Sequence, residues 1–272
     1  MIILVFIHIN KTAGRTVRYI LRSSYGTRHC EVEPWHAPWK DSPFSAADLQ
    51  RLRRYYPNLK SIAGHGLRGY VDLKANGTQH KYFTFMRDPL KTCASRFQFN
   101  VHRKNKALVF EEWIQQERVR NAQTKMIASS GDAAEAIRVI RAKNIFVGLT
   151  ERFDESMVML RALLANDLNI SYKPVNVSSD KSIKERLLSS ESTRQMLIEA
   201  NREDIQLYSF VVNELYPCYQ RDYGPSLETA VSDFQHTQNN SFNTWNLTLS
   251  RMKQYMLYRP LLYLFRTGVR AA

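Results

Sequence analysis

A nearly unbroken apolar stretch at residues 2–9, leading straight into a polar loop at residues 10–16, constrains this chain more than any other feature. The stretch does not alternate between apolar and polar side chains, which is typical of a parallel strand covered on both faces. Residues 17–21 then form an amphipathic pattern. The sequence therefore predicts a strand, a loop and a helix. A signal sequence is not favoured, because no basic segment precedes the stretch and no small-residue cleavage site follows it.

Short apolar stretches continue to alternate with helical patterns along the chain. Further strands are predicted at residues 61–64, 82–86 and 144–149. Helices are predicted at residues 45–56, 88–103, 111–128, 133–143, 150–164 and 185–216, the last with a break near residue 190. This alternation predicts an α/β domain with a central parallel sheet flanked by helices.

The composition changes near residue 223, and we expect the compact domain to span residues 1–223. Residues 224–250 are polar and are expected to form a linker or a surface extension. Residues 251–272 form a basic amphipathic tail, which favours a peripheral membrane contact, although packing of the tail against the domain is an equal alternative. Pro260 is expected to interrupt a helix in this tail. No stretch of 18 apolar residues predicts a spanning helix.

The chain is strongly basic, since its 272 residues include 39 Lys and Arg but only 25 Asp and Glu, for a net charge of +14. Such a field attracts anions, which include nucleic acids, acidic glycans, nucleotides and anionic lipids. The three cysteines are far apart and form neither a disulfide framework nor a metal-binding pair.

The first strand–loop–helix unit carries the most specific local pattern, FIHINKTAGRT at residues 6–16. The N–H groups and the dipole at the start of a helix favour an anion. Lys11 supplies a cation, Thr12 and Thr16 supply hydroxyl donors, and Gly14 lets the backbone approach a phosphate. The order of residues differs from GxxxxGK[ST] and from GxGxxG, which makes a magnesium-dependent NTPase and a dinucleotide site less favoured.

A second anion-binding pattern, FTFMRDPLKTCASRF, occupies residues 83–97. Arg87 follows a predicted strand, at the sheet edge where open α/β proteins bind their ligands. Ser95 lies two turns into the next helix, roughly 10 Å along its axis, a gap that an arginine side chain largely bridges. Both side chains are therefore candidates to bind one phosphate. Pairing of Arg87 with Asp88 or another carboxylate is the alternative.

Together these two segments resemble sulfotransferases that use 3′-phosphoadenosine 5′-phosphosulfate, and most closely the carbohydrate-type heparan sulfate 6-O- and 2-O-sulfotransferases. Further stretches agree in order at residues 64–65, 121–125, 147–153 and 204–208, so that the resemblance covers roughly residues 2–220. Asn10 stands where many members have Pro, and Arg15 where Gly, Ser or Thr is common. The resemblance implies a P-loop-type three-layer fold and a nucleotide-binding transferase.

The resemblance also implies roles for individual residues. Lys11 donates to the oxygen that bridges sulfur and phosphorus, and His65 acts as the general base, with His36 and His102 as fallback candidates. Arg87 and Ser95 hold the 3′-phosphate, and no metal takes part. The 5′-phosphate is held by the loop residues Lys11, Thr12, Ala13, Gly14, Arg15 and Thr16.

The acceptor is expected to be a hydroxyl of a glycan or glycoconjugate, since basic residues flank both motifs, although a solvated basic face is an equal alternative. Two other functions stay open, a P-loop kinase or nucleotide hydrolase, and a non-catalytic basic module that binds glycans or nucleic acid. No nucleic-acid motif supports the latter partner. The protein is expected to be cytoplasmic, with association with a membrane as one alternative and a trimmed Golgi-luminal domain as another.

Overall fold

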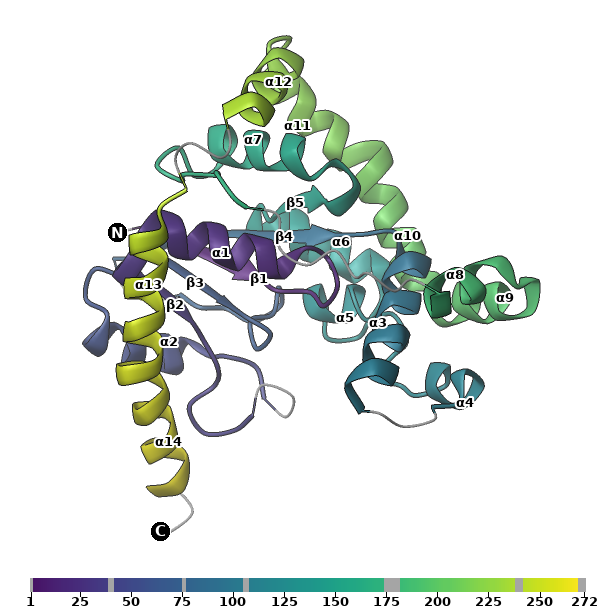
Figure 1. The fold of residues 1–272 in the computed structure, drawn as a ribbon, viewed down its shortest axis with the longest axis horizontal. Coiled ribbons are helices and arrows are strands. Elements are labelled where there is room, and N and C mark those ends of the chain that lie inside the picture. Colours follow the sequence, from purple (N-terminus) through teal and green to yellow (C-terminus); the bar gives the residue numbers. More distant parts are fainter. Residues whose placement is uncertain are drawn as a thin grey trace.

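Five parallel strands form one sheet at the centre of the computed structural model, which describes residues 2–38, 42–74, 77–104, 108–173, 182–237 and 242–268 (Figure 1). The strand order is β2-β3-β1-β4-β5. The strands are β1 (Ile2–Ile7), β2 (His29–Glu31), β3 (Ser61–Gly64), β4 (Gln79–Met86) and β5 (Phe146–Leu149). The predicted α/β domain with a central parallel sheet is confirmed, and β2 is a short strand that the sequence pattern did not reveal.

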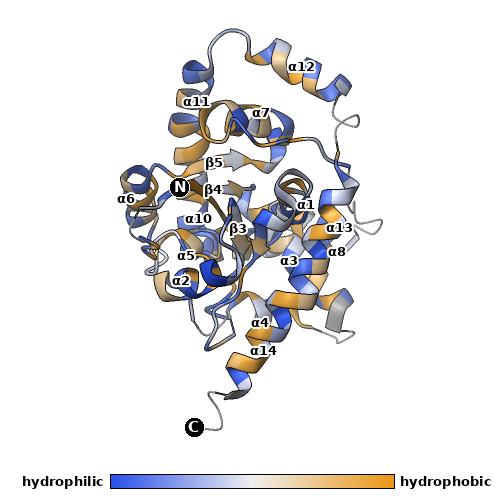
Figure 2. Ribbon diagram, turned by 90° about the vertical axis from the view of Figure 1, so that its left-hand side faces the viewer, coloured by the Kyte–Doolittle hydropathy of each residue, from blue (hydrophilic) through white to orange (hydrophobic). Residues whose placement is uncertain are grey.

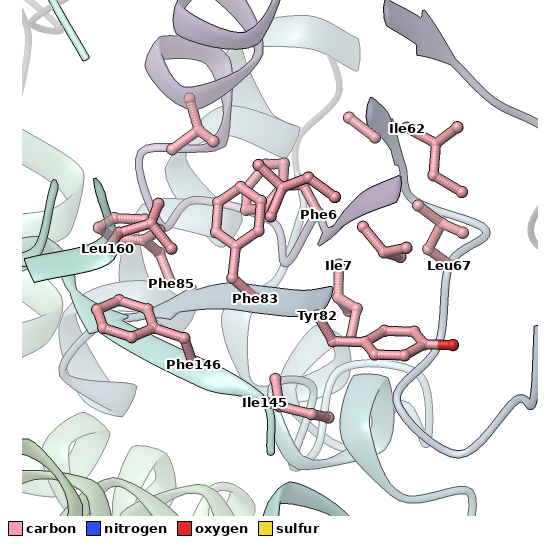
Figure 3. Close-up of a cluster of buried hydrophobic side chains, with 14 of the residues drawn as sticks. Phe6, Ile7, Ile62, Leu67, Tyr82, Phe83, Phe85, Ile145, Phe146 and Leu160 are labelled. Carbon is pink, nitrogen blue, oxygen red and sulfur yellow. The ribbon is translucent and has the colours of Figure 1, made fainter. Parts of the chain in front are cut away.

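Strand β1 lies in the middle of the sheet, and its apolar residues are covered on both faces. Ile7 pairs with Gly64 of β3 on one side and with Thr84 of β4 on the other. Phe6 stacks on Phe83 of β4, with ring centroids 4.8 Å apart, inside the cluster in Figure 3. Residues 3–7 are all at most 3% exposed, which explains why the run shows no alternation.

Helices cover both faces of the sheet. In Figure 2, α1 (Gly14–Tyr25) and α13 (Thr244–Lys253) lie on one side of the strands, and α2 (Ala46–Tyr55) and α6 (Ala133–Lys143) lie on the other. The other helices up to residue 223 are α3 (Pro89–Lys104), α4 (Phe110–Ile114), α5 (Thr124–Ile127), α7 (Phe153–Leu163), α8 (Ser182–Ser189), α9 (Glu191–Ala200), α10 (Arg202–Phe210), the π-helical η3 (Val211–Leu215) and α11 (Tyr216–Tyr223). The predicted break near residue 190 separates α8 from α9.

Two of the predicted helix starts are confirmed by their capping bonds. The Ser45 side chain accepts from the Asp48 N–H, and the Asp48 carboxylate accepts from the Ser45 N–H, which completes a capping box. The Asp88 carboxylate accepts from the Lys91 N–H at 2.8 Å at the start of α3. The helix predicted from residue 150 begins differently, because the Thr150 hydroxyl donates to the Met86 carbonyl. Thr150 begins the short 3-10 helix η2 (Thr150–Arg152), and α7 starts at Phe153.

The single helix predicted over residues 111–128 is wrong. Helix α4 ends at Ile114, and α5 begins only at Thr124. Asn121 has a φ of 47°, which a continuous helix does not allow. The Asp204 carboxylate then accepts from the N–H groups of Gln123 and Thr124 at 3.1 and 2.7 Å. A distant side chain therefore caps α5, and local propensity does not reveal such a bond.

The C-terminal part packs on the same core as the rest of the domain. Helix α12 (Leu227–Thr237) contacts α7 and buries Leu227 and Phe234, so residues 224–250 are not a linker where the structure describes them. From residue 244 onward the chain is helical without a gap through α13, the π-helical η4 (Gln254–Tyr258) and α14 (Arg259–Gly268). Pro260 therefore does not interrupt this helix. The π-helical turn η4 lies just before Pro260, and it contains the carbonyl with which the missing N–H of the proline would have bonded in an α-helix.

The tail beyond residue 251 is bound to the domain through buried side chains, among them Tyr258 and Leu262. Within the described ranges, no helix is both long and apolar enough to cross a lipid bilayer.

Candidate functional site

The loops that follow β1, β3, β4 and β5 all lie at the carboxyl edge of the sheet, because the strands are parallel. The chain passes from β3 on one side of β1 to β4 on the other. Open α/β sheets bind ligands at the carboxyl edge near such a reversal of strand order. His65 and Arg87 follow β3 and β4 there, and Lys11 lies in the loop after β1.

The loop between β1 and α1 is tightly folded. Lys11 and Ala13 adopt left-handed backbone conformations, with φ of 68° and 60°, at a cost of roughly 1–2 kcal/mol for each non-glycine residue. The buried Thr12 hydroxyl donates to the Ile9 carbonyl at 3.0 Å and closes the loop. In the described structure the Thr12 hydroxyl proton is engaged by this carbonyl, and the role of Thr12 as a hydroxyl donor to a phosphate stays a prediction.

The start of α1 offers backbone donors to an anion. Ala13, at the N-cap, has no side-chain oxygen to accept from the helix, and the first turn has no acidic residue. The first intrahelical bond runs from the Val17 N–H to the Ala13 carbonyl. The N–H groups of Gly14, Arg15 and Thr16 therefore precede the first helical bond and are available to an anion.

Gly14 is needed for a reason that the sequence did not reveal. A Cβ built on Gly14 lies only 1.9 Å from Nε2 of His8. The imidazole of His8 occupies the space where a side chain would be, and it is 6% exposed. The expectation that the missing Cβ makes room for a phosphate is therefore corrected, since the described structure fills that room with His8.

His8 and His65 form a stacked pair beneath the loop. Their ring centroids are 3.9 Å apart, and Nδ1 of His65 lies 3.0 Å from the His8 carbonyl oxygen. A carbonyl can only accept, so Nδ1 of His65 carries the proton and Nε2 carries the lone pair. Burial lowers the pKa of His65 to about 4, and the charges of Arg18 and Arg68 act in the same direction, whereas the bond to His8 opposes them. His65 is therefore neutral near pH 7, in the form that accepts a proton.

Three cations gather around the loop. The Arg87 guanidinium donates to the Lys11 carbonyl at 3.4 Å. The Lys11 ammonium lies 4.9 Å from the ring centroid of Phe99 on α3. Burial lowers the pKa of Lys11, and the charges of Arg87 and Arg15 lower it further. In the part of the chain that the structure describes, none of these cations is within ion-pair distance of a carboxylate, so the cluster suits an anionic ligand.

The backbone of Arg87 is fixed by a buried amide. Gln123 accepts from the Arg87 N–H at 3.1 Å and donates to the Arg87 carbonyl at 2.8 Å. The Asp204 carboxylate holds Gln123 in turn, by accepting from its N–H. The Asp88 carboxylate accepts from the Lys91 N–H at the start of α3, and the backbone N–H of Asp88 donates to Glu151. Among the described residues, no ion pair joins Arg87 to Asp88.

Stretches that are far apart in the sequence therefore meet at one place. Gln123 belongs to residues 121–125, Glu151 to residues 147–153 and Asp204 to residues 204–208. Tyr208 also donates to Glu151, at 3.3 Å. All three stretches belong to the sequence resemblance, although they lie outside the two anion-binding patterns. In the structure they meet around the backbone of Arg87 and Asp88.

The remaining sequence-predicted residues are placed less tightly. Ser95 is half-buried on α3, and no hydrogen bond joins it to Arg87 within the described residues. Thr16 is half-buried in the first turn of α1. Arg15 is exposed and lines a groove between α1 and the C-terminal helices. The fallback base His36 contacts Arg51, and His102 is exposed on α3.

Several of the basic residues that flank the motifs serve the fold. The Arg68 guanidinium donates to the carbonyls of His65 and Leu67. Arg96 donates to the carbonyls of Arg118 and Val119 at 3.2 Å. The guanidinium groups of these two residues are therefore engaged by backbone carbonyls of the fold. Lys106, and the side chains of Arg103 and Lys104, lie outside the described residues.

Sequence reasoning missed three residues of the site. His8 is a buried residue directly after β1, and its contacts with Gly14 and His65 place it in the site. Phe99 is 47% exposed beside Lys11, an unusual position for a large aromatic side chain. Gln123 lies in residues 121–125, which belong to the resemblance, but no role was predicted for this residue. No group of three His, Cys, Asp or Glu side chains that suits a metal ion occurs among the residues described.

No protein-family model matches this chain, and no curated protein gives a significant match to its sequence.

Proposed function

We propose that this protein is a sulfotransferase with a P-loop-type nucleotide site, which moves a sulfuryl group from 3′-phosphoadenosine 5′-phosphosulfate to a hydroxyl of a carbohydrate-type acceptor. The observation that carries the proposal is the contact between the two anion-binding segments, in which the Arg87 guanidinium lies 3.4 Å from the Lys11 carbonyl. The sequence resemblance assigns these segments to opposite ends of one nucleotide, and that assignment requires them to share one edge of the sheet.

The residues at this edge suit two phosphates. The N–H groups at the start of α1, together with Lys11, are arranged to bind a 5′-phosphate. Arg87 and Ser95 are the candidates for a 3′-phosphate, with Arg87 fixed by Gln123. The cations lack carboxylate partners in the described parts of the chain, and a bound dianion would relieve their mutual repulsion.

His65 is the proposed general base of the transfer. The donor supplies the sulfuryl group, and the acceptor oxygen forms a new S–O bond as the bond from sulfur to the phosphate oxygen breaks. The proton of the acceptor hydroxyl passes to Nε2 of His65, which carries the lone pair because Nδ1 donates to His8. Lys11 stabilises the negative charge that develops on the departing phosphate oxygen. Positioning and charge stabilisation provide most of the acceleration in such transfers.

The carbohydrate acceptor is inferred from the resemblance, and one feature of the site supports it. Phe99 presents an exposed aromatic face next to the Lys11 ammonium. An aromatic face at this position suits the apolar face of a sugar ring, or the adenine of the donor.

Calorimetric titration with adenosine 3′,5′-bisphosphate, with and without magnesium, tests the proposal. We expect binding that does not need magnesium and that is weakened by Lys11→Ala and by Arg87→Ala. Arg138→Ala is the matched control, because Arg138 is exposed on α6 on the opposite side of the sheet. Binding of ATP with a magnesium requirement, without binding of the bisphosphate, would instead support a kinase or nucleotide hydrolase.

A further inference from the structure

The C-terminal helices expose an unusual amount of apolar surface. Six large apolar side chains of this segment are at least 50% exposed, whereas elsewhere in the described chain only Val109 reaches that level. They are Trp245, Met252, Tyr255, Met256, Tyr263 and Leu264, with Met256 the most exposed at 74%. We call these six side chains the apolar stripe. A stripe of this kind marks an interaction surface.

The opposite face of the same segment is firmly attached to the domain. The Gln254 side chain accepts from the Glu31 N–H at 3.0 Å and donates to the Glu31 carbonyl at 2.7 Å. The Tyr258 hydroxyl accepts from the Glu33 N–H and donates to the Glu33 carbonyl, both at 2.9 Å. Arg266 donates to three acceptors in the loop after β2. The segment is therefore bound to the domain through one face, and the apolar stripe on its other face points to solvent.

The charged side chains of the C-terminal segment that carries the apolar stripe are all positive. Residues 242–268 contain four Arg and Lys and no Asp or Glu. A groove of about 410 Å³ is lined by residues of α1 and of this segment, and five arginines and one glutamate contribute to its walls. Glu31 pairs with Arg18 and Arg22, both at 2.9 Å. The other three arginines of this groove have no carboxylate partner among the residues described: Arg15, Arg251 and Arg259.

We propose that this face docks on an anionic phospholipid membrane, with the apolar stripe in the interface and lipid phosphates in the arginine groove. Helices that lie in a membrane interface combine a basic flank with Trp, Phe and Leu on the inserted side. Trp and Tyr suit the headgroup level, because one end of each ring system is polar. The absence of acidic residues from residues 242–268 suits an anionic lipid surface as the partner.

The docked orientation places the loop between β1 and α1 next to the membrane. Arg15 lines the groove and also belongs to the first turn of α1, one residue after Gly14. The docking itself does not depend on the proposed sulfotransferase activity, since it rests on the C-terminal helices and the groove alone.

Vesicle co-sedimentation tests the proposal with the full chain. We expect binding to vesicles that contain phosphatidylglycerol, weak binding to vesicles of phosphatidylcholine alone, and release by high salt. Removing a basic residue near an anionic surface weakens binding about fivefold, so Arg251→Ser with Arg259→Ser should weaken it roughly twenty-fivefold. Arg138→Ser with Arg161→Ser is the matched control, because both arginines are exposed on other helices.

The apolar stripe has its own test. Met256→Ser with Leu264→Ser should weaken vesicle binding at least tenfold, whereas Val212→Ser, at an exposed position on η3, should leave it unchanged. Brominated lipids should quench the fluorescence of Trp245, and this quenching should be absent from Trp245→Phe. Equal binding of all variants, or binding to soluble heparin without binding to vesicles, would overturn the proposal.

Discussion

The contact between Gly14 and His8 gives the sharpest prediction about the site. A Cβ on Gly14 lies 1.9 Å from Nε2 and 2.0 Å from Cδ2 of His8, whereas comfortable contacts are about 3.5 Å. Gly14→Ala therefore requires the imidazole to move by roughly 1.6 Å. The ring is stacked on His65 at 3.9 Å and on Phe6 at 5.5 Å, so it has little room to move. Overpacking of this kind costs typically 1–3 kcal/mol, and we expect about 3 kcal/mol here.

A double-mutant cycle measured by urea unfolding checks this prediction. His8→Ala alone should lower the free energy of unfolding by about 2–3 kcal/mol, because it removes a buried ring. Gly14→Ala with His8→Ala should be no less stable than His8→Ala, because the new methyl group occupies the vacated space. A coupling of about 3 kcal/mol between the two positions follows. Additive losses in the double variant would refute the steric reasoning.

Three further predictions concern the residues around His65 and Arg87. His65→Ala should lower turnover roughly 10²- to 10⁴-fold while keeping the affinity for adenosine 3′,5′-bisphosphate, and undiminished turnover would remove His65 as the base. Burial lowers the pKa of His8, His29 and His65 below 6.5, so the unfolded chain takes up protons first and the free energy of unfolding should fall as the pH drops from about 6.5 toward 4. Urea unfolding across this pH range should show a smaller fall for His8→Asn than for the unmodified protein. An equal fall in both proteins would contradict the role of His8. Gln123→Ala should cost about 2 kcal/mol in chemical denaturation, because the part-buried N–H and C=O of Arg87 both lose a partner, and an unchanged stability would show that Gln123 does not hold this backbone.

The sequence predicted those parts of the fold that depend on local pattern. The unbroken apolar run predicted β1 as a parallel strand covered on both faces, because burial on both faces removes the need for alternation. Ser45 and Asp88 identified the starts of α2 and α3, because their capping bonds join residues only three apart. The two candidate anion-binding patterns were likewise found next to predicted strand ends. Lys11 and Arg87 of these patterns do lie together at one edge of the sheet.

The features that the sequence did not predict depend on contacts between distant residues. Asp204 caps α5 from 80 residues away along the chain, so the break before Thr124 has no local signal. His8 looks like any buried strand residue until His65 stacks on it. The polar composition of residues 224–250 suggested a linker or a surface extension, but α12 contacts α7 and buries Leu227 and Phe234 in the core.

The central claim is that two separate segments hold opposite ends of one nucleotide. Its most direct test is the ratio of the affinities for adenosine 3′,5′-bisphosphate and adenosine 5′-monophosphate, measured by calorimetry. In the unmodified protein the 3′-phosphate should increase affinity roughly 10- to 100-fold, as a charged hydrogen bond typically does. Arg87→Ala should bring this ratio close to one, and Lys11→Ala should weaken both nucleotides alike. A ratio that Arg87→Ala leaves unchanged would contradict the account.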